Sequence, residues 1–227
     1  TLAGLLKLKG LPRLRGLELC HIGLTDQDVP KFREFDHLEK LNLGDNQITD
    51  AGLANLKALT NLKEHALVGC PITDAGLAHL GGLTGLQALS LASTSVTDAG
   101  LAISEVDRVD PIDLHALIRL DLSDTAISRE SLSHLKNMTH LQELILDETS
   151  VTDAALAHLK GLVNLRILGF RGTSITDAGL IHLMTLSNLH ELNLNDTAVT
   201  DAGLPSLHRL RMLRRISLIN TKVTEAG

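Results

Sequence analysis

Eleven histidines and two cysteines are the residues of this chain that could ligate a metal or form a nucleophile–base pair. His134, His158 and His182 recur at one position of a 24-residue period, and His79 holds that position earlier. Equivalent side chains on neighbouring helices would lie roughly 8–10 Å apart, too far for one ion with ligand distances near 2 Å. No HExxH, CxxC, GxSxG, P-loop or dinucleotide glycine motif is present. We therefore predict no catalytic residue, no metal site and no cofactor.

The two cysteines, Cys20 and Cys70, lie two periods apart and at different positions of the period. Two strand spacings alone would separate them by roughly 9–10 Å, which exceeds the reach of a disulfide. We predict that both are free thiols. Cysteine usage thus gives no sign of an oxidising compartment.

One period, residues 38–61, shows which elements hold these side chains. Leu41-Asn42-Leu43 alternates apolar and polar residues, which predicts a half-buried strand. Thr49 and Asp50 are good helix N-cap residues, and Leu53 and Leu56 follow at helical spacing. Each period is therefore a short strand, a turn and a short helix. Because 24 residues cannot enclose a core, neighbouring periods must stabilise one another.

The same frame covers the whole chain and predicts one domain over residues 1–227, with nine repeats after a partial N-terminal one. The repeats begin at Leu14, Leu38, Leu62, Leu86, Leu117, Leu141, Leu165, Leu189 and Leu213. Strands stack about 4.8 Å apart and helices roughly 8–10 Å apart, so the stack should bend with its sheet inside. Gly52 and its equivalents are expected to let neighbouring helices approach closely. Because the chain starts and stops inside a repeat, we expect a fragment of a longer array; the alternative is a compact array whose ends tolerate exposure.

This pattern resembles the leucine-rich repeat family, whose common form is LxxLxLxxNxL. Most copies here have Thr in place of Asn, followed by an (I/V)TDAGL segment, as at Thr49–Leu53. The variant is similar to bacterial repeat arrays and, more loosely, to the repeats of F-box substrate receptors. The resemblance implies an α/β fold, a right-handed solenoid curved like a horseshoe with a parallel sheet on the concave face and short helices on the convex face. For function it implies only that the family commonly binds proteins.

Composition narrows the classes of partner. The chain is 44% hydrophobic but only 1% aromatic, so leucine must pack the core. The formal charge of −6 is mild, and we saw no basic stretch, which argues against a nucleic-acid or anionic-membrane partner. No apolar run is long enough to span a membrane, so we predict no membrane insertion.

Two irregularities could carry function. His65 stands at a core position of its repeat, either as a neutral hydrogen-bonded histidine or as a pH-sensitive weak point. The interval from Leu86 to Leu117 has seven extra residues, within which residues 105–113 are acidic. They form either a solvated bulge on the helical side or a projection that contacts a partner.

Alternation along each strand leaves three positions per repeat facing outward on the sheet. Two exposed isoleucines with polar neighbours mark the strongest candidate patch for a partner, and Gly169 beside them leaves a notch. The patch consists of Asp121, Ile145, Asp147, Ile167, Arg171 and Asn193. Apolar anchors with a polar rim are typical of protein interfaces. The alternatives are that single surface isoleucines are ordinary and that Asp147 only pairs with Arg171.

The leading hypothesis is a non-catalytic module that binds a protein partner on the concave sheet. One rival is a structural spacer or scaffold segment of a larger protein. Another is the substrate-recognition part of a larger enzyme or ubiquitin-ligase-type assembly, although no F-box is visible.

Overall fold

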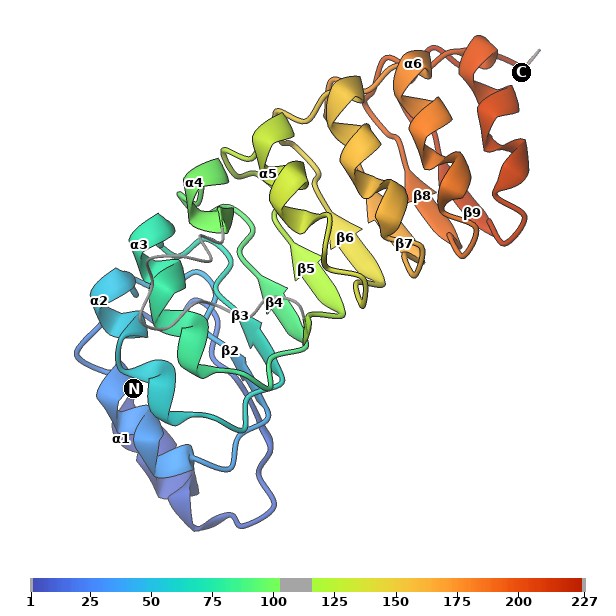
Figure 1. Cartoon of the computed structure of the whole chain (residues 1–227). Coiled ribbons are helices and arrows are strands. Elements are labelled where there is room, and N and C mark those ends of the chain that lie inside the picture. The colour runs from blue at the N-terminus through green and yellow to red at the C-terminus, as the bar shows by residue number, and fades with distance from the viewer. Residues whose placement is uncertain (1, 103–115, 226–227) are drawn as a thin grey trace. The chain divides into compact units, whose positions relative to one another are not determined.

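Strands and helical turns alternate along this computed structural model, which describes residues 2–102 and 116–225 (Figure 1). The chain divides into two compact units, Thr1–Ala116 (unit 1) and Leu117–Gly227 (unit 2). The described part of unit 1 has four strands, β1 (Gly16–Glu18), β2 (Lys40–Asn42), β3 (Glu64–Ala66) and β4 (Ala88–Ser90). That of unit 2 has five, β5 (Arg119–Asp121), β6 (Glu143–Ile145), β7 (Ile167–Gly169), β8 (Glu191–Asn193) and β9 (Arg215–Ser217).

Short helices, some α and some 3-10 (η), connect these strands. In unit 1 they are α1 (Leu2–Leu5), η1 (Leu6–Gly10), η2 (Val29–Phe35), α2 (Asp50–Leu53), η3 (Leu56–Ala58), α3 (Asp74–Leu77), η4 (Ala78–Gly82) and α4 (Asp98–Leu101). In unit 2 they are α5 (Arg129–Leu135), η6 (Asp153–Gly161), α6 (Asp177–Leu180), η7 (Ile181–Thr185) and η8 (Asp201–Arg209).

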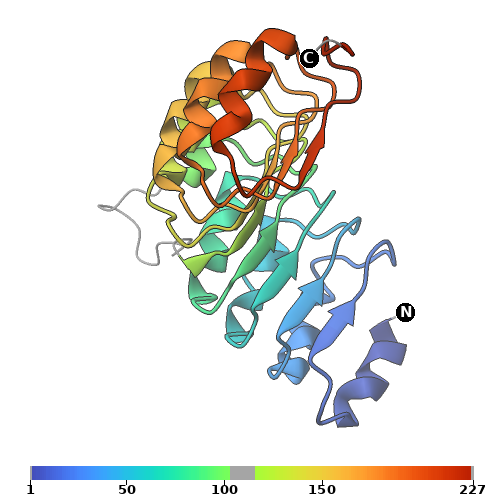
Figure 2. The same ribbon diagram turned by 90° about the vertical axis from the view of Figure 1, so that its right-hand side faces the viewer.

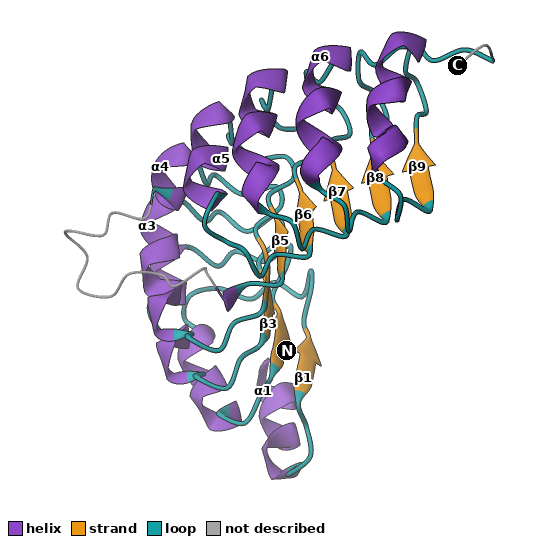
Figure 3. Cartoon of the chain, turned by 45° about the vertical axis from the view of Figure 1, so that its right-hand side comes forward, coloured by secondary structure: helices purple, strands orange, loops and turns teal. Residues whose placement is uncertain are grey.

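The strands of each unit pair in parallel and in the predicted register. In unit 2, Leu120 pairs with Leu144, Leu144 with Leu168 and Leu168 with Leu192. Strands line one face and helices the other, as the two rows of unit 2 show in Figures 2 and 3. The predicted solenoid of parallel strands and short helices is thus confirmed within each unit.

Leucine fills the space between strands and helices, as the composition predicts. Leu144 and Leu165 are completely buried in unit 2, as are Leu43 and Leu62 in unit 1. These residues occupy the first, fourth and sixth positions of their repeats. The core is therefore a set of leucine layers that each repeat shares with the next.

The Thr-Asp-Ala-Gly-Leu segment joins neighbouring repeats. Thr176 caps α6 by accepting the Ala178 N–H at 3.2 Å. The same threonine donates its N–H and its hydroxyl to the two carboxylate oxygens of Asp153 in the preceding repeat, at 2.8 and 2.6 Å. A Cβ on Gly179 would collide with Asp153 Oδ1. The glycine therefore makes room for Asp153 and Leu156 of the neighbouring η6, in line with our expectation that it lets neighbouring helices approach closely.

Two successive repeats of unit 2 depart from this arrangement. Arg129 stands where the aspartate would be, and the following Thr152 makes no side-chain cap bond. In that following repeat Ala155 replaces the glycine and is completely buried. With no aspartate to accommodate, the position tolerates a methyl group.

One of the two irregularities noted in the sequence, His65, has a definite outcome. His65 is 3% exposed, and its Nδ1 lies 2.8 Å from the Leu41 carbonyl oxygen, so the hydrogen-bonded core histidine is confirmed. Cys20 and Cys70 are both free, as predicted. The acidic residues 105–113 lie outside the described part of the chain. Among the described residues, the helices are too short or too polar to cross a bilayer.

Candidate functional site

An open hollow of about 280 Å³ lies on the strand face of unit 2. Its walls come from strands β6 to β9 and from the turns that follow them. The lining residues are Ile145, Asp147, Ile167, Leu168, Gly169, Glu191, Leu192, Asn193, Asn195, Arg215 and Ser217. Four of the six residues predicted from the sequence are among them, namely Ile145, Asp147, Ile167 and Asn193.

Gly169 shapes this hollow. A Cβ there would lie 2.6 Å from Asp147 Oδ1 and 3.1 Å from Ile145 Cγ2. Because the glycine has no side chain, Asp147 and Asn193 meet above β7, with Asn193 Nδ2 donating to Asp147 Oδ2 at 3.4 Å. The notch predicted beside Ile145 is therefore partly occupied by a carboxylate and an amide that hold each other in place.

Asp147 is half-buried, and its bonds differ from the side-chain ion pair with Arg171 that was one of the alternatives. Its Oδ1 accepts the backbone N–H of Arg171 at 2.8 Å, whereas the Arg171 guanidinium pairs elsewhere. Burial raises the pKa of the Asp147 carboxyl above its usual value, opposed by that backbone hydrogen bond and assisted by the nearby charge of Asp121. The hollow thus contains a half-buried carboxylate whose negative charge is stabilised mainly by a hydrogen bond from one backbone N–H.

The two remaining predicted residues lie outside the lining of the hollow. Arg171 is exposed, with its Nε 3.0 Å from Asp196 Oδ2 and a terminal nitrogen 3.6 Å from Glu148 Oε1. These carboxylates raise the pKa of Arg171. Asp121 Oδ1 accepts the Ser123 N–H at 3.0 Å and its hydroxyl at 2.6 Å. Both predicted side chains are engaged in local bonds next to the hollow.

The rim of the hollow contains residues that the sequence analysis did not assign to the patch. Glu191 and Arg215 pair across β8 and β9 at 3.4 Å, as their adjacent places in one repeat column predict. Asn195 Oδ1 accepts the Ile219 N–H at 2.7 Å. The repeat frame could have identified Glu191 and Arg215. In the parallel register Glu191 pairs with Ile167, and Arg215 pairs with Glu191.

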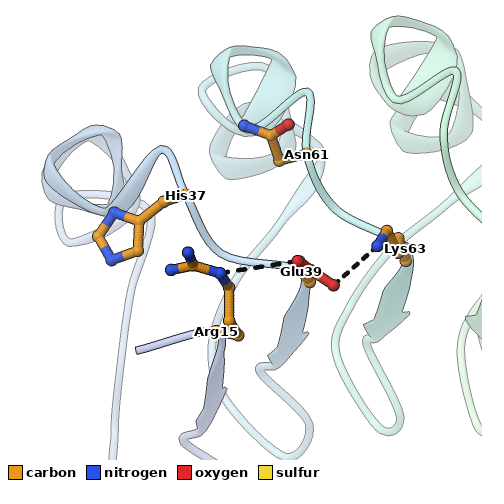
Figure 4. Close-up of a pocket in the computed structure, with 5 residues that line it drawn as sticks. All are labelled: Arg15, His37, Glu39, Asn61 and Lys63. Atoms are coloured by element: carbon orange, nitrogen blue, oxygen red, sulfur yellow. Dashed lines mark hydrogen bonds and ion pairs between the residues drawn. The ribbon is translucent and has the colours of Figure 1, made fainter. Parts of the chain in front are cut away.

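Unit 1 has a second hollow, of about 230 Å³, lined by Arg15, His37, Glu39, Asn61 and Lys63 (Figure 4). Glu39 stands between two cations, with Oε2 2.8 Å from Lys63 Nζ and Oε1 3.7 Å from Arg15 Nε. The Lys63 hydrogen bond lowers the pKa of Glu39. Both cations of this hollow are thus ion-paired with Glu39, which leaves the unit 2 hollow as the better candidate site.

The described residues offer little for catalysis or metal binding. No three His, Cys, Asp or Glu side chains among them are grouped closely enough to hold a metal ion. Burial raises the pKa of the Cys70 thiol, which disfavours the thiolate that a nucleophile requires. What the unit 2 hollow can do is contact another molecule through an apolar floor and a hydrogen-bonding rim.

Comparison with known proteins identifies the family to which this fold belongs. Residues 37–57 and 185–207 match the family described as Leucine Rich repeat. Among curated protein sequences, none matches the chain.

Three solved structures serve for comparison. Internalin C2 of Listeria monocytogenes str. 4b F2365 is 31% identical with a TM-score of 0.71, over 89% of this chain and 80% of that one. Internalin inlF of the same strain is 20% identical with a TM-score of 0.59, over 92% of this chain and 67% of that one.

The third is the ectodomain of the Arabidopsis thaliana receptor kinase GASSHO1/SCHENGEN3, 22% identical with a TM-score of 0.59. That match covers 95% of this chain but only 25% of the receptor chain, and at this identity it shows the fold alone. The likeness to internalin C2 extends over most of both chains and agrees with the leucine register of the strands. On these grounds the chain belongs to the leucine-rich repeat family.

Proposed function

We propose that this protein is a non-catalytic protein-interaction module whose partner binds on the strand face of unit 2. The observation that carries the proposal is the hollow itself, where two half-buried isoleucines, Ile145 and Ile167, meet a hydrogen-bonding rim. Interfaces typically combine a small apolar centre with polar surroundings. Enclosed ligand pockets usually measure roughly 300–1,000 Å³, so an open hollow of about 280 Å³ suits a protruding partner side chain better than a free small molecule.

Rigidity of the rim supports this proposal. Asp147 is fixed by the Arg171 amide and by Asn193, and Asn193 Oδ1 in turn accepts the Asn195 N–H at 3.1 Å. Side chains that are already ordered lose little conformational entropy when a partner binds. Both isoleucines lie in short strands that the sheet holds in place, so the site is part of the rigid framework of unit 2.

The family also supports a binding role in general terms. The GASSHO1/SCHENGEN3 ectodomain is described in complex with CASPARIAN STRIP INTEGRITY FACTOR 2. This complex is a property of the receptor. For this chain it serves only as an example of a protein with this fold that binds a ligand. The partner of this chain is inferred to be a protein because the hollow is open and shallow.

The test compares two pairs of substitutions. Ile145→Glu with Ile167→Glu places charges in the hollow, whereas Val163→Glu with Ile181→Glu places the same charges at exposed aliphatic residues outside it. A partner is first captured with the wild-type chain, purified, and its affinity then measured by titration calorimetry. We expect the hollow variant to bind at least about tenfold more weakly and the control to bind like wild type.

Both variants are first checked for an unchanged urea unfolding midpoint. A milder pair, Ile145→Ala with Ile167→Ala, serves if the glutamates unfold unit 2. Equal affinity of the hollow variant and wild type would move the site elsewhere. Failure of any purified protein to bind would favour the spacer hypothesis.

A further inference from the structure

One edge of unit 2 carries a group of arginines that the hollow does not use. Arg166, His190 and Arg214 hold the same repeat position, each immediately before its strand, β7, β8 and β9 respectively. Their backbones are direct neighbours: the His190 N–H donates to the Arg166 carbonyl, and the Arg214 N–H to the His190 carbonyl, both at 2.8 Å. Arg209 ends η8, and Arg211 lies in the turn that follows it. We name Arg166, His190, Arg209, Arg211 and Arg214 the arginine edge.

In the part of the chain that the structure describes, these arginines have no acidic partner. All four are exposed, and none has a carboxylate within 4.0 Å among the residues that the structure describes. Other arginines of unit 2 behave differently: Arg215 pairs with Glu191 at 3.4 Å and Arg171 with Asp196 at 3.0 Å. The fold therefore can neutralise an exposed arginine, and along this edge it does not.

The same repeat position in unit 1 provides an internal comparison. There the column reads Arg15, Glu39 and Lys63, and the carboxylate between two cations forms an ion pair with each (Figure 4). Nothing about the position demands a cation, because Glu39 occupies it without disturbing the strand register. In unit 2, His190 holds the middle place between Arg166 and Arg214, so no carboxylate at this position offsets the two arginines. Their charges therefore remain available to a ligand.

We propose that the arginine edge binds a short acidic segment of a partner protein. Guanidinium groups form paired hydrogen bonds with carboxylates, so the chemistry of the edge matches Asp and Glu side chains. The whole chain carries a formal charge of −6 despite these four arginines, so a long polyanion that extended well past the edge would on balance be repelled. The chain also has no Trp or Tyr on which nucleic-acid bases could stack. A short acidic segment would not extend past the arginines and would not need aromatic side chains for stacking.

This edge is distinct from the hollow, because none of its five residues lines the hollow, although Arg215 next to Arg214 does. The inference therefore goes beyond the proposed function and stands even if the hollow proves inert.

The test measures fluorescence anisotropy of a labelled ten-residue peptide of alternating Glu and Ala, titrated with the full chain. We expect Arg166→Gln with Arg214→Gln to weaken binding about tenfold or more. Arg209→Gln with Arg211→Gln is a second pair that should act in the same direction. The matched control, Arg15→Gln with Lys63→Gln, removes two cations that are both ion-paired with Glu39 and should leave binding unchanged. Raising the salt concentration should weaken binding by the wild type.

Three results would overturn the proposal. The peptide could fail to bind the wild-type chain, or the unit 1 control could lose as much affinity as both edge variants. A ten-nucleotide oligouridylate or phosphatidylserine vesicles could instead bind more tightly than the peptide at equal salt, which would assign the edge to nucleic acid or membrane. Binding of Ile145→Ala with Ile167→Ala at wild-type affinity would confirm that the edge acts independently of the hollow.

Discussion

His65 is the buried residue whose protonation should most affect the stability of unit 1. Its Nδ1 donates to the Leu41 carbonyl at 2.8 Å, and its buried Nε2 has no partner among the described residues. Burial lowers the pKa of His65 from 6.5 to about 4. A proton added at Nε2 would place a positive charge in the leucine core with no acceptor.

We predict that the free energy of unfolding falls by about 3 kcal/mol as the pH drops from 6.5 to 4 because of this histidine. In that range the unfolded chain binds a proton at His65 and the folded chain does not, and each pKa unit is worth about 1.4 kcal/mol. Above pH 6.5 the effect is fully absent. Urea unfolding of wild type and His65→Leu at pH 7.5 and 4.5 measures it. Identical pH dependence in the two proteins would contradict the prediction.

A second prediction at the residue scale concerns Leu144, which is completely buried between repeats. We expect Leu144→Ala to lower the free energy of unfolding by about 2–5 kcal/mol, because it removes packed atoms and leaves a cavity. Ile181, which is 52% exposed, supplies the control: Ile181→Ala should cost at most about 0.5–1 kcal/mol. Equal shifts of the urea midpoint would contradict the register of the repeat.

Side-chain positions at the candidate site were predictable where backbone direction alone decides them. Ile145 and Ile167 face outward because strand residues alternate, and that holds whatever their neighbours are. The partner of Arg171 was not predictable, since a long side chain can reach Asp147, Glu148 or Asp196 with little difference in energy. The choice depends on Asp147 already accepting a backbone N–H, which only coordinates reveal.

At the scale of elements, the Thr-Asp-Ala-Gly-Leu segment predicts a coupling between repeats. Gly179→Ala should lower the free energy of unfolding by about 1–3 kcal/mol, although alanine favours helices, because its methyl collides with Asp153. In a background of Asp153→Ala, which itself loses the bonds to Thr176, adding Gly179→Ala should be neutral or stabilising. A double-mutant cycle followed by urea unfolding measures this coupling.

Ala155 provides the control for that cycle. Its preceding repeat has Arg129 in place of aspartate, so Ala155→Gly should lose helix propensity and one buried methyl group and cost about 1–2 kcal/mol. Additive effects in the Asp153–Gly179 cycle would show that the glycine has another role.

The order and type of the elements followed from the 24-residue period, because strand alternation and the leucine spacing agree with each other in every repeat. The division of the helical segments into α and 3-10 turns did not. Thr-Asp-Ala-Gly-Leu forms a four-residue α turn in α2, α3, α4 and α6, but the equivalent Asp201–Arg209 of η8 is 3-10 throughout. Segments this short have nearly equal energies in the two forms, so the sequence pattern cannot separate them.

For the whole molecule, net charge proved a poor guide to local surfaces. A formal charge of −6 and the expected absence of a basic stretch argued against a nucleic-acid or anionic-membrane partner. Arg209, Arg211, Arg214 and Arg215 nevertheless fall within seven residues of unit 2, so the expectation of no basic stretch was wrong. The parallel strands then bring Arg166 and His190 beside Arg214. A sum over the chain hides this because the acidic residues are spread over other repeats.

The repeat frame also predicts that residues 1–227 form one domain, whereas the structure describes two compact units. We expect one cooperative transition in guanidinium, because stacked repeats unfold together when the coupling between neighbours is strong. Leu53→Ala in unit 1 and Leu180→Ala in unit 2, both completely buried, should then lower the same midpoint whether circular dichroism or hydrogen exchange follows unfolding. If each variant lowers protection only in its own unit, and the other unit keeps the wild-type midpoint, the units unfold independently and the prediction of one domain is wrong.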